Sequence, residues 1–325
     1  MDPSHGALAL GMHSFQVPFR RCGAFVVVCA ILLLHSAAAH AQNLGHKVPG
    51  LLGLDAGRIP EPGLYLASRA VIYEAGKLRD RDGNTIPTGP LDFLAFANAF
   101  GVSYTTRIFS GTISLTTTVA GPIAGIKLDV ANRQEAGIDR FGLGDPYIQP
   151  IRLGWRKERF DLVTSYGIYL PAGKSALAGG SGVSSGRVTH EFSAGGSSYF
   201  KDRTRFLTAL ASYQLNKRQR GIDITRGNTV QIQGGIGTSL FGQLVEAGLA
   251  GYALWQVRDD RGTDVPTPLR GARDQVYGLG PEAAITLKEI RGNVRVRYEW
   301  DIGVRARPQG AVFVAGINFL VYKPQ

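Results

Sequence analysis

Polar and apolar residues alternate strictly in the stretch NVRVRYEWDIGVRARPQG, which is residues 293–310. One series is apolar and contains Val294, Val296, Tyr298, Trp300, Ile302, Val304 and Ala306. The other is largely charged and contains Asn293, Arg295, Arg297, Glu299, Asp301, Gly303 and Arg305. Strict alternation predicts a β-strand whose two faces meet opposite environments. A soluble sheet and a transmembrane β-strand both produce this pattern, and they differ in which face points inward.

The same alternation recurs along the chain and predicts about twelve strands. They lie near residues 62–78, 91–104, 109–121, 142–156, 159–171, 187–200, 204–215, 228–240, 243–257, 274–288, 291–306 and 311–322. No stretch after residue 42 contains the ~20 apolar residues that a transmembrane helix requires. The 43 glycines of the chain fit strands that bend around a closed barrel.

The predicted connections alternate between long and short. Long polar connections follow the first, third, fifth, seventh and ninth strands, at 79–90, 122–140, 172–186, 216–227 and 258–273. Tight turns follow the even strands, such as KDR at 201–203 and GQ at 242–243. A soluble β-sandwich has no reason to sort its loops by length. The sequence therefore predicts an all-β fold, a transmembrane antiparallel β-barrel of about 12 strands with short periplasmic turns and long extracellular loops.

In such a barrel the apolar series faces lipid and the charged series faces the lumen. Arg or Lys on the lipid side at mid-bilayer costs ~2–4 kcal/mol, and the alternation avoids that cost. The predicted lumen-lining residues are Arg295, Arg297, Glu299, Asp301, Arg305, Glu246, Glu282 and Lys288. They form either a selective pathway or an internal salt-bridge lattice that stiffens a small barrel, and the sequence leaves both open.

The N-terminal residues 1–41 have the order of a signal peptide. Arg20 and Arg21 precede an apolar run, and small residues precede a predicted cleavage site after Ala41. Cleavage removes both cysteines and lowers the net charge from +11 to +10, because the segment carries the two arginines against Asp2. An exported basic protein is expected to meet lipopolysaccharide or an anionic solute rather than nucleic acid.

Residues 42–61, QNLGHKVPGLLGLDAGRIPE, precede the first predicted strand and are marked by proline and glycine. They form either a plug inside the lumen or a periplasmic tail, and the barrel itself is predicted to span residues 62–322. A twelve-stranded barrel is narrow, so any inserted segment nearly closes it.

Pro146 and Pro150 interrupt an otherwise alternating strand, and each lacks a donor for the sheet ladder. The parity of the apolar residues changes across Pro150, which indicates a bulge. We expect either a lateral opening in the wall, through which an apolar solute passes into the membrane, or an irregularity at the rim.

Motifs for enzyme chemistry are nearly absent. The chain after residue 41 has His46 and His190 as its only histidines, so a metal site or a serine–histidine pair would have to use one of them. His190 lies on a predicted apolar face, where an outer-membrane phospholipase carries its catalytic groups, although an interfacial polar residue is the commoner role. We expect no catalytic residue, no metal and no cofactor.

Several stretches together resemble the family named for the meta pathway of phenol degradation, whose members are outer-membrane transport proteins. HKVPGLLGLDAGRIPEPGLYLASRAVIYEAGKLRDRDGN resembles the opening of its mature proteins, and further similar stretches follow in matching order at 142–155, 215–230, 251–262, 276–283 and 294–310. The C-terminal strand, 311–322, also resembles the signal read by barrel-assembly machinery. The resemblance implies an outer-membrane channel for passive uptake of small hydrophobic or aromatic compounds. The alternatives are a barrel enzyme acting on lipid and a structural or adhesive surface barrel.

Overall fold

The computed structural model describes residues 46, 49–88, 90–130, 138–289 and 291–324. The described residues all belong to one compact unit, residues 40–325. The predicted signal peptide therefore lies outside the described residues. Among those residues no helix is long and apolar enough to cross a membrane.

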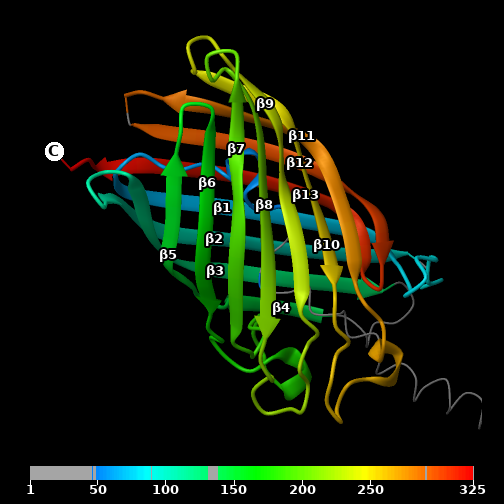
Figure 1. Cartoon of the computed structure of the whole chain (residues 1–325). Coiled ribbons are helices and arrows are strands. Elements are labelled where there is room, and N and C mark those ends of the chain that lie inside the picture. Colours follow the sequence, from blue (N-terminus) through cyan, green and yellow to red (C-terminus); the bar gives the residue numbers. More distant parts are fainter. Residues whose placement is uncertain (1–45, 47–48, 89, 131–137, 290, 325) are drawn as a thin grey trace, which may run out of the picture. The chain divides into compact units, whose positions relative to one another are not determined.

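The described part of the chain is built almost entirely from antiparallel strands (Figure 1). They are β1 (Gly63–Leu78), β2 (Leu91–Ile108), β3 (Ile113–Val130), β4 (Ile138–Leu143), β5 (Tyr147–Arg156), β6 (Phe160–Tyr169), β7 (Thr189–Phe200), β8 (Arg205–Asn216), β9 (Thr229–Leu240), β10 (Val245–Gln256), β11 (Gln275–Leu287), β12 (Gly292–Arg305) and β13 (Pro308–Tyr322). Short 3-10 helices occur at η2 (Gly53–Asp55), η4 (Ala176–Ala178) and η5 (Thr267–Leu269).

The sheet closes on itself as a barrel. β1 pairs with both β2 and β13, and β2 pairs with β3, so the first and last strands form the seam. β4 and β5 both pair with β3, along Ile123–Leu128 and Ile113–Ala120 respectively. β4 and β5 therefore follow each other along the same edge of β3 and together occupy the place of one strand. The thirteen strand segments thus form a barrel of twelve strand positions. The predicted twelve-stranded antiparallel barrel is confirmed.

The wall is interrupted at residues 144–146, between β4 and β5. Among the described strands only β3 pairs with β4, because β6 ends at Tyr169 and the chain enters the loop 170–188. Leu170 N donates to Pro146 O at 3.0 Å, which closes the β5–β6 ladder just below the interruption. A second irregularity, a register shift between Ile148 and Ile151, lies at Pro150. Along β4, this strand position is therefore hydrogen-bonded to a neighbouring strand on one edge only.

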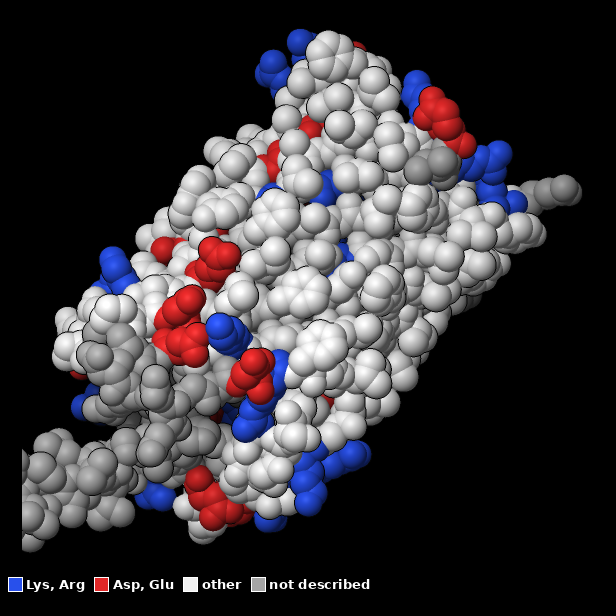
Figure 2. Space-filling model, turned by 180° about the vertical axis from the view of Figure 1, so that it is seen from behind, with Lys and Arg blue, Asp and Glu red and all other residues white. Residues whose placement is uncertain are grey.

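The two faces of the wall differ as the alternation requires. On β12 the side chain of Trp300 is 53% exposed, whereas Glu299 is fully buried. Figure 2 shows the outer surface from behind as a broad uncharged band, with charged side chains gathered mainly toward its ends. The apolar series thus faces outward and the charged series of β12 up to Asp301 faces inward.

The predicted connection 122–140 is wrong over most of its length, because β3 continues to Val130 and β4 begins at Ile138. A proline normally ends a strand because it lacks a backbone donor. The carbonyl of Pro122 accepts from Gly144 N at 2.8 Å, and in an antiparallel ladder N–H and C=O of one residue point to the same neighbour. The backbone nitrogen of Pro122 therefore faces the interruption, where no strand carbonyl requires a hydrogen-bond donor.

Two predicted lumen residues do not line the lumen. Gly303 has φ of +58° and forms a bulge against β11, which reverses the alternation: Val304 is buried and Arg305 is exposed. Lys288 lies beyond the end of β11, exposed in a turn. Strict alternation failed in both cases because it assumes a regular strand.

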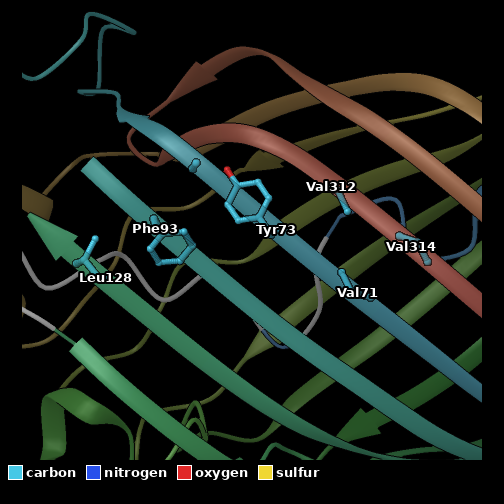
Figure 3. Close-up of a cluster of buried hydrophobic side chains, with 7 residues drawn as sticks. Val71, Tyr73, Phe93, Leu128, Val312 and Val314 are labelled. Atoms are coloured by element: carbon cyan, nitrogen blue, oxygen red, sulfur yellow. The ribbon is translucent and has the colours of Figure 1, made fainter. Parts of the chain in front are cut away.

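An apolar cluster covers part of the inner wall across the seam (Figure 3). Its buried members come from β1, β2, β3 and β13, and they are Val71, Tyr73, Ala75, Phe93, Leu128, Val312 and Val314. Tyr73 donates to Asp301 Oδ2 at 2.7 Å, which places the cluster on the same inner face as the charged residues of β12. The inside of the barrel thus has an apolar side and a charged side.

Replacing Gly303 with alanine is expected to destabilise the barrel by about 1–3 kcal/mol. The backbone conformation disfavours a side chain, and a Cβ would lie 2.7 Å from Tyr277 Cδ2. The matched control is Gly121→Ala in β3, where nothing lies within 4 Å of the added Cβ. Urea unfolding in lipid vesicles measures both, and equal stabilities of the two variants would contradict the bulge.

Candidate functional site: the lumen segment and its junction with the wall

Residues 46 and 49–61, hereafter the lumen segment, contact the inner wall along the barrel. Near the long loops His46 lies 2.7 Å from Thr189 Oγ1, at the start of β7. At the other end Arg156, the last residue of β5, donates to the carbonyl of Ile59 at 2.6 Å. The segment therefore extends from the long-loop end of the barrel to the short-turn end.

Backbone groups of the segment are bonded to side chains from different wall strands. Gln233 of β9 accepts from Leu52 N at 2.9 Å, and Thr208 of β8 accepts from Gly57 N at 2.8 Å. Arg69 of β1 donates to the carbonyl of Leu51 at 3.0 Å on the opposite side. These bonds satisfy backbone groups that an irregular buried segment would otherwise leave unpaired.

A carboxylate on β11, Glu282, is the centre of the charged side of the lumen. Its oxygens accept from Arg295 Nη1 at 2.7 Å and from Arg297 Nη1 at 3.0 Å. The backbone N–H of Leu54 also donates to it, at 3.1 Å. Because Glu282 has 2% of its surface exposed, its charge is stabilised by these donors rather than by water.

The charged network continues from Glu282 into the lumen segment. Arg295 Nη2 lies 2.9 Å from Asp55 and 3.1 Å from Glu246. Arg58 Nη1 lies 2.9 Å from Glu246, and its guanidinium stacks on Phe206 at 4.0 Å. Asp55 and Arg58 of the segment thus supply ion-pair partners for the wall residues Arg295 and Glu246.

Two glycines let the segment approach the wall closely. A Cβ on Gly53, whose φ is +49°, would lie 2.0 Å from Glu282 Oε2. A Cβ on Gly57 would lie 2.0 Å from the carbonyl oxygen of Gly196 in β7. No side chain fits at either position, so the glycine spacing of GLLGLDAG is set by the wall.

Asp145, in the interruption of the wall, joins three parts of the chain. Its carboxylate accepts from Ala172 N at 2.9 Å and from the hydroxyls of Ser184 and Ser185 at 2.6 and 2.5 Å, all in the loop 170–188. His46 Nδ1 of the lumen segment lies 3.0 Å from the same carboxylate. These donors surround the buried carboxylate and stabilise its negative charge.

His46 is enclosed at this junction. Its ring stacks on Tyr169 with centroids 4.7 Å apart. Its Nδ1 lies 3.0 Å from the carboxylate of Asp145, and its Nε2 lies 2.7 Å from Thr189 Oγ1. The histidine thus fastens the lumen segment to the interrupted wall.

Six of the eight residues predicted to line the lumen lie together on the inner face. Glu246, Glu282, Arg295 and Arg297 form the network around the segment; Glu299 lies 2.9 Å from Arg297, and Asp301 accepts from Tyr252 at 2.5 Å. Sequence reasoning missed Asp145, His46 and the serines, because their partners are 27 to 143 residues away in the chain. The proline after Asp145 was the only local signal.

His190, considered as a catalytic residue, accepts or donates a hydrogen bond with Tyr166 at 2.9 Å on the outer face. Among the described residues no group of three or more His, Cys, Asp or Glu side chains has the arrangement of a metal site.

Comparison with known proteins gives a family and a fold. A model of the family described as "Putative MetA-pathway of phenol degradation" matches residues 75–315. No curated protein matches the chain.

Among solved structures, the COG4313 outer membrane channel from Pseudomonas putida F1 superposes with a TM-score of 0.70 at 9% identity, covering 82% of this chain and 97% of that one. The translocator domain of the autotransporter NalP from Neisseria meningitidis has a TM-score of 0.45 at 11% identity, over 92% of this chain and 97% of the other. The first likeness shows that the fold is that of an outer-membrane barrel.

Replacing Glu282 with alanine is expected to cost about 3–5 kcal/mol of stability, because two buried arginines lose a shared carboxylate. The control is Glu289→Ala, at an exposed turn position, which is expected to change stability by less than about 0.5 kcal/mol. Urea unfolding in vesicles measures both. An ordinary hydrogen bond contributes ~1 kcal/mol to stability. A smaller loss than this in Glu282→Ala would mean that the stability of the barrel does not depend on the network.

Proposed function

We propose that this chain, which belongs to the MetA-pathway of phenol degradation family, is an outer-membrane channel for passive uptake of small hydrophobic or aromatic compounds. The observation that carries the proposal is a lumen occupied by a segment of the same chain, with an apolar wall on one side of it. The lumen segment acts as a plug that excludes large and strongly hydrated solutes.

The apolar side of the lumen offers a path for uncharged solutes. Leu51 of the lumen segment packs against the cluster of Val71, Phe93 and their neighbours. Arg69 of β1 donates to the carbonyl of Leu51 here, but the clustered side chains themselves are uncharged, whereas the opposite side is held by ion pairs between wall and segment. A small aromatic compound can pass between packed apolar side chains after modest displacements, while an ion would have to leave its water.

The interruption between β4 and β5 provides the lateral exit. Along β4 the wall lacks a partner strand on one edge, and the outward side chains of Phe141 and Leu143 are 70% and 71% exposed. The opening lies beside Pro146 and the bulge at Pro150. The bonds of Asp145 to the loop 170–188 and to His46 keep it closed at rest.

In the same proposal the channel lies in the outer membrane. The apolar outer face contacts outer-membrane lipid, and the long loops contact lipopolysaccharide. The barrel-assembly machinery recognises β13, whose outward residues include Phe313 and Val321, both exposed. In this proposal the protein is a transporter and carries out no chemical step, so His190 is an interfacial residue.

Flux through the purified protein tests the channel directly. In planar bilayers and liposomes the wild type is expected to pass phenol while conducting ions poorly. Asp145→Asn weakens the attachment of the lumen segment, so ion conductance should rise several-fold. Thr267→Ala, at an exposed position in the outer loop between β10 and β11, is the control and should leave both unchanged. Absence of phenol flux in a folded barrel would reject the proposal.

The lateral exit has a separate test. Replacing Pro146 and Pro150 with valine supplies ladder donors and regularises the wall. The double variant should fold but lose phenol transfer into the membrane, while its ion conductance stays at the wild-type level. Undiminished phenol transfer would place the exit elsewhere and leave the channel itself unaffected.

A further inference from the structure

The outer face of the barrel has an apolar dent near the short-turn end. Its volume is about 550 Å³, and it is lined by Phe200, Arg205, Phe206, Ile236, Gly237, Thr238, Ala247, Gly248 and Leu249. This volume lies within the roughly 300–1,000 Å³ of ligand sites. The dent spans the ends of β7, β8, β9 and β10, far from the lumen junction at Asp145.

The pairing register explains why the surface is hollow there. Arg205, Thr238 and Ala247 lie side by side in one outward row across three strands. The next outward row along the strands contains Ile236 and Leu249, whose side chains are 61% and 51% exposed. Small side chains at 238 and 247 between these large ones leave a depression. In a membrane, lipid chains fill this depression, because water is excluded from the apolar surface of the wall.

Arg205 distinguishes this dent from an ordinary irregularity of the surface. It is exposed, it lines the dent, and it has no hydrogen-bond or ion-pair partner among the described residues. An outward guanidinium on a lipid-facing wall is tolerated when it reaches the headgroup layer. Arg205 is the first residue of β8, directly after the turn that carries Lys201 and Arg203. This position places it at headgroup level, where planar, bidentate binding of phosphate suits arginine.

We propose that the dent is a binding site for one phospholipid of the periplasmic leaflet, with its phosphate on Arg205 and an acyl chain in the depression. The assignment rests on the membrane location in the proposed function, not on transport. Packing alone gives little preference in a bilayer, because lipid tails are as apolar as the wall. The shape of the dent and the phosphate contact together distinguish a bound lipid from its neighbours.

Native mass spectrometry of the full barrel, released from detergent and titrated with dipalmitoyl phosphatidylglycerol, tests this site. The wild type is expected to retain one lipid at activation energies that strip the rest. Arg205→Gln should reduce the retained fraction at least several-fold, and Ala247→Leu, which fills the dent, should do so with the arginine intact. The control is Lys288→Gln, which removes an exposed cation at another short turn.

Each outcome decides the proposal. Retention unchanged in both Arg205→Gln and Ala247→Leu, or lowered equally by Lys288→Gln, would overturn it. Displacement of the lipid by phenol at concentrations that saturate flux would also overturn it, by making the dent a solute site. Phenol flux and ion conductance of Arg205→Gln should stay at the wild-type level, so failure of the lipid site and failure of the channel are distinguishable.

Discussion

The shared carboxylate of Glu282 is the interaction on which the arrangement inside this barrel depends. It takes donors from two arginines of β12 and from the backbone of Leu54, so wall and lumen segment are stabilised by the same charge. Without it Arg295 would keep Asp55 and Glu246 as ion-pair partners and Arg297 would keep Glu299, so each buried guanidinium would lose one of its anions. Because the segment brings Asp55 and Arg58 of its own, it neutralises the wall as well as filling the space beside it.

The division of the lumen into a charged and an apolar side follows from where this network lies. Ion pairs need donors and acceptors in register, and β10, β11 and β12 supply them on adjacent strands. The seam strands supply Val71, Phe93 and Val312 instead, which pack without direction. The segment is held on the charged side by several ion pairs and on the seam side by the bond from Arg69 to the carbonyl of Leu51. In the proposed channel the seam side, with fewer directional bonds, is therefore the face that yields to a solute.

Much of the wall could be predicted from the sequence, because alternation with period two is a local property. Trp300 and Glu299 are assigned to opposite faces by position alone. Arg305 could not be placed, since the bulge at Gly303 exists only in the pairing of β12 with β11. Likewise, Pro122 predicts the end of a strand, because the sequence does not show the interruption of the wall that lies opposite it. The roles of His46 and Asp145 are set by contacts between residues far apart in the chain, and Pro146 marks only that the strand is irregular there.

The distance in sequence between the partners also governs when the barrel becomes closed. Leu54 and Glu282 are 228 residues apart, and contacts of such separation form late in folding. The lumen segment can dock on Glu282 only after β11 has joined the wall. In the proposed channel, the completion of the wall and the plugging of the pore are therefore a single event.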